Sequence, residues 1–171
     1  MKDMELLPLN DPLLKKVPEE FDDWDNVQEF VDDLWKFQKT IGGVGLSANQ
    51  VGLDAKVFTM GIKTHRWNII NPKLISTSEE IVMMEEGCLS APGLMLKVKR
   101  PEKCTLTYMN ENKEEVIEEF EGVWARIVLH EYDHMLGQSF LQRVGPVQLD
   151  RAMTKIKKQT KRMIQRRESN E

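Results

Sequence analysis

The segment His130-Glu131-Tyr132-Asp133-His134 has the form H-E-x-x-H. In a helix, residues four positions apart lie on one face, so His130 and His134 could bind the same metal ion. Glu131 lies about a third of a turn away and could reach a water molecule without binding the metal itself. A hydrolytic metal site needs three protein ligands and one open position. The segment therefore predicts two ligands and a general base, and it requires a third ligand elsewhere.

The third ligand has few candidates, because the sequence contains only three histidines and two cysteines. His65 lies in a polar, turn-like stretch, and Cys104 lies in an alternating strand pattern, where a cysteine is usually a small core residue. Cys88 differs, because it follows Gly87 shortly after the apolar run 81–84, and a glycine there lets the backbone approach a ligand closely. A Cys/His/His set with a free fourth position would suit zinc or ferrous iron.

The H-E-x-x-H pattern also occurs by chance in helices that bind no metal, so its interpretation depends on the rest of the chain. Three blocks occur in order: GVGLSANQ at 43–50, EGCLS at 86–90 and HEYDH at 130–134. Together they closely resemble the three signature motifs of the peptide deformylases, metalloenzymes that remove the formyl group from the N-terminal methionine of new polypeptide chains. Two blocks match the family patterns in full, and the first has Ser47 where alanine is commoner. The resemblance covers most of residues 6–143.

The resemblance implies both a function and a metal. The chain would be a metal-dependent hydrolase that releases formate from N-formylmethionyl peptides. Cys88, His130 and His134 would bind one divalent ion. Ferrous iron is implied as the physiological metal, often replaced by zinc, nickel or cobalt in isolated protein, whereas the ligand types alone do not choose between iron and zinc.

The resemblance also implies catalytic roles for three further residues. Glu131 would accept a proton from the attacking water and deliver it to the leaving amine. The side-chain amide of Gln50 and the backbone N–H of Leu89 would stabilise the oxyanion of the tetrahedral intermediate. Gln50 could instead cap local backbone groups of the glycine-rich segment.

A substrate site is expected around these residues. The bare backbone of Gly43 and Gly45 could pair with an extended substrate as an added strand, or these glycines could simply form a turn. An apolar pocket would receive the methionine side chain, although some of its candidate residues could be ordinary core. Trp124 and Arg126 lie near this pocket on the same helix, and either would alter substrate preference if it faces the cleft. The substrate-binding candidates are Gly43, Val44, Gly45, Leu46, Met84, Glu86, Gly87, Val123 and Ile127.

Charged residues near the motifs have more than one interpretation. Asp133 could form a hydrogen bond with a ligand imidazole, or it could form an ion pair on the surface. Glu86 and Arg100 could form a buried pair that steadies the loop at Cys88, although charged residues are usually exposed.

Length and composition indicate one globular domain over residues 1–171. The chain is 40% hydrophobic and 30% charged, close to the average for globular proteins. No window approaches the apolar length of a membrane span, and residues 1–5 lack the long apolar region of a signal peptide. Two cysteines, one of them required as a thiolate, favour a reducing compartment. We therefore expect a cytoplasmic protein, and we expect it to be a monomer.

Periodicity predicts an α+β fold, in which small mixed or antiparallel sheets pack around a central helix that carries H-E-x-x-H. An extended arm over 1–24 precedes the N-terminal helix, which Asp25 or Asn26 could cap and which ends near Thr40. The central helix is expected over 123–136 and the C-terminal helix over 146–167. Strands are expected at 56–61, 67–70, 73–76, 81–84, 94–98, 104–108 and 115–120, with a hairpin turn at 110–113.

The C-terminal helix has a distinct charge. Residues 1–150 contain 16 basic and 26 acidic residues, a net charge of −10, whereas residues 151–171 contain 8 basic and 2 acidic residues, a net charge of +6. One interpretation is a solvated amphipathic helix, and another is a segment that binds polyanionic RNA. The resemblance supports the second, because bacterial deformylases are understood to dock on the ribosome near the tunnel exit through such a helix. Its apolar stripe consists of Leu149, Met153, Ile156, Met163 and Ile164.

Two other functions fit part of the sequence. A general metallopeptidase could carry H-E-x-x-H, but Cys88 and the block at 43–50 argue against it. A non-catalytic binding protein could have the same scaffold, but Glu131, Gln50 and the complete ligand set argue against that.

Overall fold

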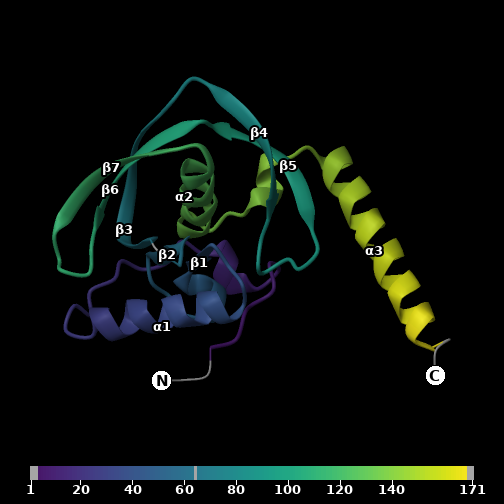
Figure 1. The fold of residues 1–171 in the computed structure, drawn as a ribbon, viewed down its shortest axis with the longest axis horizontal. Helices are drawn as coiled ribbons and strands as arrows, with labels where there is room; N and C mark the ends of the chain where they lie inside the picture. The colour runs from purple at the N-terminus through teal and green to yellow at the C-terminus, as the bar shows by residue number, and fades with distance from the viewer. Residues whose placement is uncertain (1–3, 64, 169–171) are drawn as a thin grey trace.

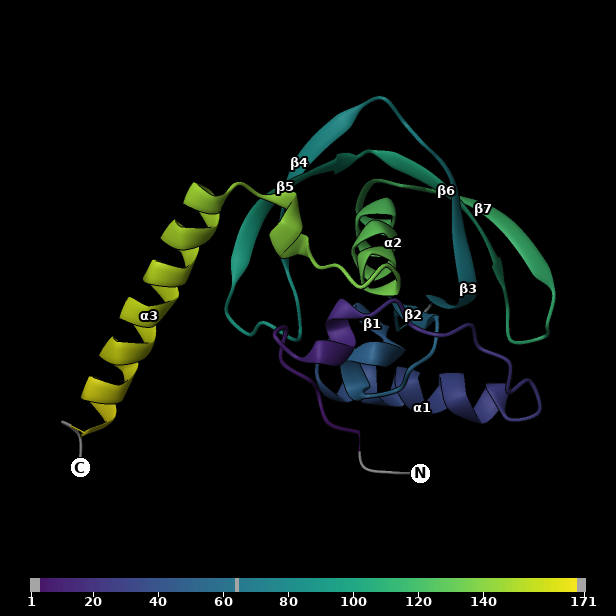
Figure 2. The same ribbon diagram turned by 180° about the vertical axis from the view of Figure 1, so that it is seen from behind.

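Helix α2 (Gly122–Met135) lies at the centre of the molecule. The structure, a computed structural model, describes residues 4–63 and 65–168, with side chains of the last helix described as far as Lys158. Most strands of two antiparallel sheets arch over α2 on one side, whereas helix α1 (Val27–Thr40) lies on the other side together with the first two strands of the larger sheet (Figure 1, Figure 2). The predicted α+β arrangement around the H-E-x-x-H helix is therefore confirmed.

The strands form two separate sheets. The larger sheet has the order β1-β2-β3-β6-β7, and every neighbouring pair is antiparallel. A second sheet consists of the hairpin β4-β5. Cys88 lies in the loop that connects these two strands. The strands are β1 (Gly45–Ser47), β2 (Val57–Ile62), β3 (His65–Thr77), β4 (Ile81–Gly87), β5 (Met95–Pro101), β6 (Lys103–Met109) and β7 (Glu115–Glu121).

Two predicted strands are one continuous strand. The sequence predicted strands at 67–70 and 73–76, but β3 runs through both. Its register against β6 shifts between Ile70 and Lys73, around Asn71 and Pro72. Pro72 has no N–H to donate to a neighbouring strand, and Asn71 has a positive φ of 51°, so pairing is interrupted without ending the strand. The Asn71 side chain binds both backbone groups of Phe21, which ties the N-terminal arm to this irregularity.

Strand β1 was not predicted. It is only three residues long, is buried throughout, and lies in a glycine-rich segment without alternating polarity. Its pairing with β2, which joins Gly45 to Met60 and Ser47 to Phe58, defines it as a strand. Leu94 was predicted to begin a strand, but its N–H donates to the carbonyl of Ala91 in the turn before β5.

Three apolar clusters surround α2. One fills the space between α2 and the larger sheet and includes Phe58, Leu106 and Val128. A second lies between α1 and the strands β1 and β2, where the amphipathic face of α1 buries Val31 and Leu34. A third cluster joins Cys88 to Leu96, Val98 and Phe140.

The C-terminal helix α3 (Pro146–Glu168) extends away from the body of the molecule (Figure 1, Figure 2). Leu149, Ala152 and Ile156 pack against the third cluster and attach the start of the helix. Met153, predicted on the same stripe, is 41% exposed, and the side chains of Met163 and Ile164 lie outside the described part of the chain. Among the described helices, none combines the length and apolar composition needed to cross a bilayer.

Packing against α2 predicts unequal effects of two substitutions in the β6-β7 hairpin. Leu106 is fully buried, whereas Ile117 on β7 is 69% exposed. Leu106→Ala should lower the free energy of unfolding by about 2–5 kcal/mol, because it leaves a cavity in the core. Ile117→Ala should change it by less than about 0.5 kcal/mol. Denaturant unfolding of protein with equal metal content measures both, and equal losses would contradict this description of the core.

Candidate metal centre

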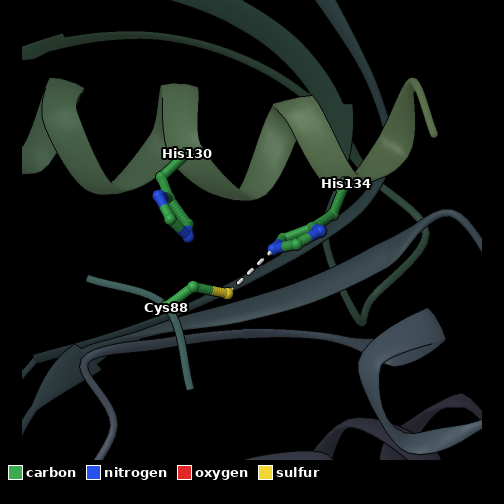
Figure 3. Close-up of side chains that lie close together, drawn as sticks. All are labelled: Cys88, His130 and His134. Carbon is green, nitrogen blue, oxygen red and sulfur yellow. Dashed lines mark hydrogen bonds between the residues drawn. The ribbon is translucent and has the colours of Figure 1, made fainter. Parts of the chain in front are cut away.

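Cys88, His130 and His134 lie together, although Cys88 is more than 40 residues from either histidine in the sequence (Figure 3). Their ligand atoms all lie within 4.8 Å of one another, and the three side chains are buried. Both histidines extend from the same face of α2, and Cys88 follows the last residue of β4. The four-residue spacing in α2 places the two histidines side by side, and the loop after β4 brings Cys88 to them.

The donor set fits a tetrahedral metal ion. Cys88 Sγ lies 3.5 Å from His134 Nε2. Metal–ligand bonds of about 2.0–2.3 Å at tetrahedral angles separate donors by roughly 3.5 Å. One thiol and two imidazoles are also the ligand types that zinc and iron accept.

The two histidines differ in basicity when no metal is bound. Burial, together with the nearby positive charges of His130 and Arg100, lowers the pKa of His134 to about 3. Burial also opposes protonation of His130, but its contacts with Cys88 and Glu86 outweigh burial and raise its pKa to about 10. Because a metal binds only the neutral imidazole, metal binding displaces a proton from His130.

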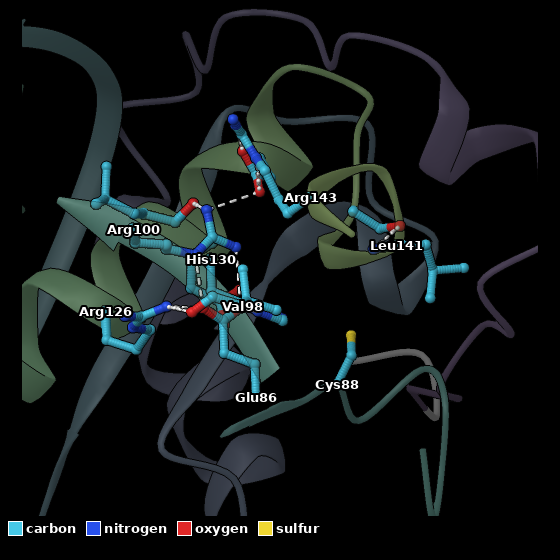
Figure 4. A network of polar contacts seen from close by, with 12 residues as sticks. Glu86, Cys88, Val98, Arg100, Arg126, His130, Leu141 and Arg143 are labelled. Carbon is cyan, nitrogen blue, oxygen red and sulfur yellow. Dashed lines mark hydrogen bonds and ion pairs between the residues drawn. The ribbon is translucent and has the colours of Figure 1, made fainter. Parts of the chain in front are cut away.

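Glu86 orients His130 through a buried ion-pair network (Figure 4). Its carboxylate accepts hydrogen bonds from Arg100 Nε at 2.6 Å, Arg100 Nη2 at 2.9 Å and Arg126 Nη1 at 2.7 Å. Burial alone would raise the pKa of Glu86, but His130 and the two arginines hold it well below its usual range. The ionised carboxylate only accepts, so His130 Nδ1, at 3.1 Å, donates to it and Nε2 is the nitrogen left for a metal. The predicted buried Glu86–Arg100 pair is confirmed.

Both interpretations of Asp133 are wrong. Asp133 is almost completely buried, so it forms no surface pair, and His134 Nδ1 has no hydrogen-bond partner among the described residues. The Asp133 carboxylate instead binds Arg100 Nη1 at 2.9 Å and the guanidinium of Arg143. Asp133 has this partner because the packing of β5 against α2 places Arg100 between Glu86 and Asp133.

Glu131 and Gln50 lie beside the three donors. Burial raises the pKa of Glu131, although His130, Ser47 and Arg100 partly oppose the increase. Gln50 Nε2 donates to Cys88 Sγ at 3.4 Å and to Ser90 Oγ at 3.1 Å. Its Oε1 accepts the backbone N–H of Ser47 at 3.0 Å in a capping box of the short helix η2 (Ala48–Val51). Gln50 therefore caps the local backbone, as one interpretation predicted, and still directs its amide to the metal centre.

A cavity of about 870 Å³ opens onto these groups. Gln50, Leu89, Glu131, Cys88 and His130 all line it. The predicted substrate-binding residues that line it are Gly43, Val44, Gly45, Met84, Glu86, Gly87, Val123 and Ile127.

Leu46 is the exception among the predicted substrate-binding residues. Its side chain is fully buried in the cluster between α1 and β2, because successive residues of a strand point to opposite faces. The Leu46 side chain therefore does not line the cavity, and a part of this residue in substrate binding stays a prediction. The bulky Trp124 and Arg126 do line the cavity, as the sequence allowed.

Several lining residues were not predicted. Leu6, Ile41, Ile62 and Met95 come from the arm, the end of α1, β2 and β5, which no local pattern connects to the motifs. Ser90, which binds Gln50, was within the EGCLS block and could have been proposed from its position.

Close approach explains two of the glycines. A Cβ atom on Gly45 would lie 2.5 Å from Glu131 Oε1, and one on Gly43 would lie 2.8 Å from Leu89 Cδ1. Neither position tolerates a side chain without movement of a cavity residue, so these glycines are more than turn residues.

Comparison with known proteins agrees with the arrangement. Residues 4–150 match the family model described as polypeptide deformylase. The chain is 36% identical over 151 residues to a peptide deformylase of Treponema pallidum, with 88% of this chain and 93% of that protein covered. It is 39% identical over 140 residues to a peptide deformylase of Caulobacter vibrioides, with 78% and 80% covered.

Solved structures are similar as well. A peptide deformylase from Synechococcus elongatus superposes with a TM-score of 0.85 at 29% identity, covering 91% of this chain and 86% of that one. A peptide deformylase from Thermotoga maritima superposes with a TM-score of 0.80 at 30% identity, covering 84% and 98%.

The ion-pair network predicts a large effect of Arg100→Met. The substitution leaves Glu86 and Asp133 buried with fewer partners, so the free energy of unfolding should fall by about 3–5 kcal/mol. Lys99→Met is the matched control, because Lys99 is the preceding residue of β5 and is exposed. Denaturant unfolding of the two variants tests this, and a loss no larger than that of the control would mean that Arg100 is dispensable.

Proposed function

The chain belongs to the polypeptide deformylase family, and on that premise we propose that Cys88, His130 and His134 hold the catalytic metal ion. It is a hydrolase that removes the formyl group from the N-terminal formylmethionine of nascent polypeptides. The observation that carries the assignment of the ligands is the convergence of their donor atoms within 4.8 Å at the wall of the cavity. Enzymes of this family are metal-dependent.

We propose ferrous iron as the physiological metal, with zinc, nickel or cobalt able to replace it in isolated protein. One thiolate and two imidazoles accept all of these ions, so the donor set supports the proposal without selecting among them. When bound, such an ion polarises the substrate carbonyl and lowers the pKa of a water molecule toward neutrality.

Glu131 is the proposed proton carrier. It takes a proton from the attacking water and delivers it to the amine that leaves with the peptide. Burial raises the pKa of its carboxyl group, which suits a group that must both accept and donate a proton. The Gln50 amide and the Leu89 N–H are the proposed donors to the oxyanion, and both residues line the cavity beside Cys88.

The substrate is proposed to bind along β1. Within residues 4–63 and 65–168 this strand pairs with β2 alone, so its other edge has backbone groups available for an added strand. Gly45 lies on this edge without a side chain, whereas the backbone N–H and carbonyl of Gly43 are already bonded to Gln38, so the proposed pairing rests on Gly45. Backbone pairing would accept many different N-terminal sequences. The methionine side chain would lie against the apolar residues of the cavity, of which Val44, Met84, Val123 and Ile127 are the proposed contacts.

Hydrolysis by iron-loaded protein tests the proposal. Anaerobically purified protein should release formate from formyl-Met-Ala-Ser, and Glu131→Ala should lower kcat/KM by about 10²–10⁴ because proton transfer is lost. Glu119→Gln, an exposed acid on β7, is the control and should retain full activity.

Two outcomes would contradict the proposal. Equal cleavage of the unformylated peptide would indicate a general metallopeptidase. No formate from protein with one metal per chain would indicate a non-catalytic binding protein.

We also propose that α3 docks on the ribosome near the tunnel exit. Its net charge contrasts with that of the acidic body, and its first turns hold it to the third cluster while the helix extends outward (Figure 2). Lys155, Lys157 and Lys158 are exposed, whereas Ala152 and Ile156 pack on the body. This arrangement would present basic side chains to RNA while the apolar ones anchor the helix.

Charge reversal tests docking without removing the anchor. Changing Lys155, Lys157 and Lys158 together to Glu should reduce salt-sensitive co-sedimentation with ribosomes by about tenfold or more. Hydrolysis of a small formyl peptide should not change. The corresponding triple change to Arg keeps the charge and should still bind. Undiminished co-sedimentation of the Glu variant would rule out docking through these residues.

We further propose that residues 1–171 act as one catalytic domain and as a monomer in the cytoplasm. Both cysteines are unpaired thiols in the structure, which fits a reducing compartment. All three apolar clusters contact the elements that form the metal centre, which fits a single unit.

A further inference from the structure

A serine hydroxyl contacts the carboxylate of Glu131. Ser47 Oγ lies 2.6 Å from Glu131 Oε2, although the two residues are 84 positions apart in the sequence. Ser47 is fully buried and Glu131 is 4% exposed. Ser47 Oγ also lies 3.5 Å from the backbone carbonyl of Glu131, but a hydroxyl has one proton, and the carboxylate oxygen is the nearer acceptor. The hydroxyl therefore donates to the carboxylate.

The two oxygens of this carboxylate have different surroundings. Oε2 faces Ser47, which does not line the cavity. Oε1 faces Gly45, where an added Cβ atom would lie only 2.5 Å away, and Gly45 does line the cavity. Oε1 therefore occupies the space that a side chain on Gly45 would fill, at a residue that lines the cavity, while Ser47 occupies the position beside Oε2.

We propose that Ser47 is a positioning residue, whose hydroxyl holds Oε2 and so keeps Oε1 directed to the cavity as the oxygen that carries the proton. The inference rests on the proposed role of Glu131. Among the described residues, no other side chain or backbone N–H donates to this carboxylate, so the hydroxyl is the contact that selects its orientation.

The position of Ser47 is itself determined by the oxyanion donor. The Ser47 backbone N–H donates to Gln50 Oε1 at 3.0 Å, and Gln50 Nε2 donates to Cys88 Sγ and Ser90 Oγ. The pairing of Ser47 with Phe58 in the sheet holds the same backbone from the other side. One residue thus connects the group proposed to carry the proton with the group proposed to stabilise the oxyanion.

Alanine is the commoner residue at this position of the motif, so the hydroxyl tunes the reaction in this chain and is not required for it. In Ser47→Ala, kcat should fall about tenfold, the change expected when one hydrogen bond to the reacting group is lost. KM should stay within about twofold, because Ser47 does not line the cavity that receives the substrate. Ser47→Cys, which keeps a weak donor, should give an intermediate kcat.

Ser78→Ala is the matched control. The Ser78 hydroxyl forms two hydrogen bonds at the turn between β3 and β4, and Ser78 does not line the cavity, so this variant should keep the wild-type kcat. Metal content and melting temperature are measured for each variant, so that misfolding is recognised. If Ser47→Ala does not fold, Ser47→Cys alone provides the test through its ratio of kcat to KM.

A double-mutant cycle gives the decisive comparison. In a Glu131→Ala background, Ser47→Ala should have no further effect on kcat, because the hydroxyl has lost the group through which it acts. A further tenfold loss in that background, or a wild-type kcat in Ser47→Ala alone, would overturn the inference. Failure of the proposed function is distinguishable, because wild-type protein would then release no formate or Glu131→Ala would remain active.

Discussion

The buried guanidinium of Arg100 is the contact on which the geometry of the metal centre depends. In the part of the chain that the structure describes, the β4-β5 hairpin shares no strand pairing with the larger sheet, so contacts outside the sheets hold it against α2. Arg100 on β5 binds Glu86 on β4, Asp133 on α2 and the carbonyl of Leu129 on α2. A buried charge is costly without hydrogen-bonded partners, and these contacts provide them by joining the hairpin to the helix. This docking of the hairpin brings Cys88 to the two histidines.

The same ion-pair network orients His130, one of the proposed metal ligands. Glu86 accepts from two arginines and from His130, so it stays ionised in a buried position and determines which imidazole nitrogen faces Cys88. Arg126 also binds the carbonyls of Val82 and Val98, and therefore lines the cavity as a paired group rather than as a free charge. The charged groups in this wall of the cavity are therefore paired with one another or with backbone carbonyls. The apolar residues of the cavity remain available to an apolar side chain.

The loop that carries Cys88 and the start of the basic helix α3 pack against the same apolar cluster. Cys88 belongs to the apolar cluster that also contains Phe140 and receives Leu149, Ala152 and Ile156 of α3. Arg143, three residues before α3, binds Asp133 in the ion-pair network. The helix therefore leaves the body beside the loop that carries Cys88, and its exposed lysines do not line the cavity.

The family, the proposed metal ligands and the proposed general base could all be predicted from the sequence, because the residues within each motif lie at short spacing along the chain. Four residues separate His130 from His134 in any helix, and Gly87-Cys88-Leu89 is continuous. The periodicity of α1 and α2 likewise indicated which faces would be buried.

The features that join distant segments follow from tertiary packing and could not be predicted from the sequence. Tertiary packing placed Leu46 in the core, made β3 one strand, gave Asp133 two arginine partners and brought Ser47 to Glu131. These contacts depend on the register of β1 against β2 and on the docking of a hairpin against a helix. Neither leaves a periodic signal in the chain, because each arises when surfaces far apart in sequence pack together.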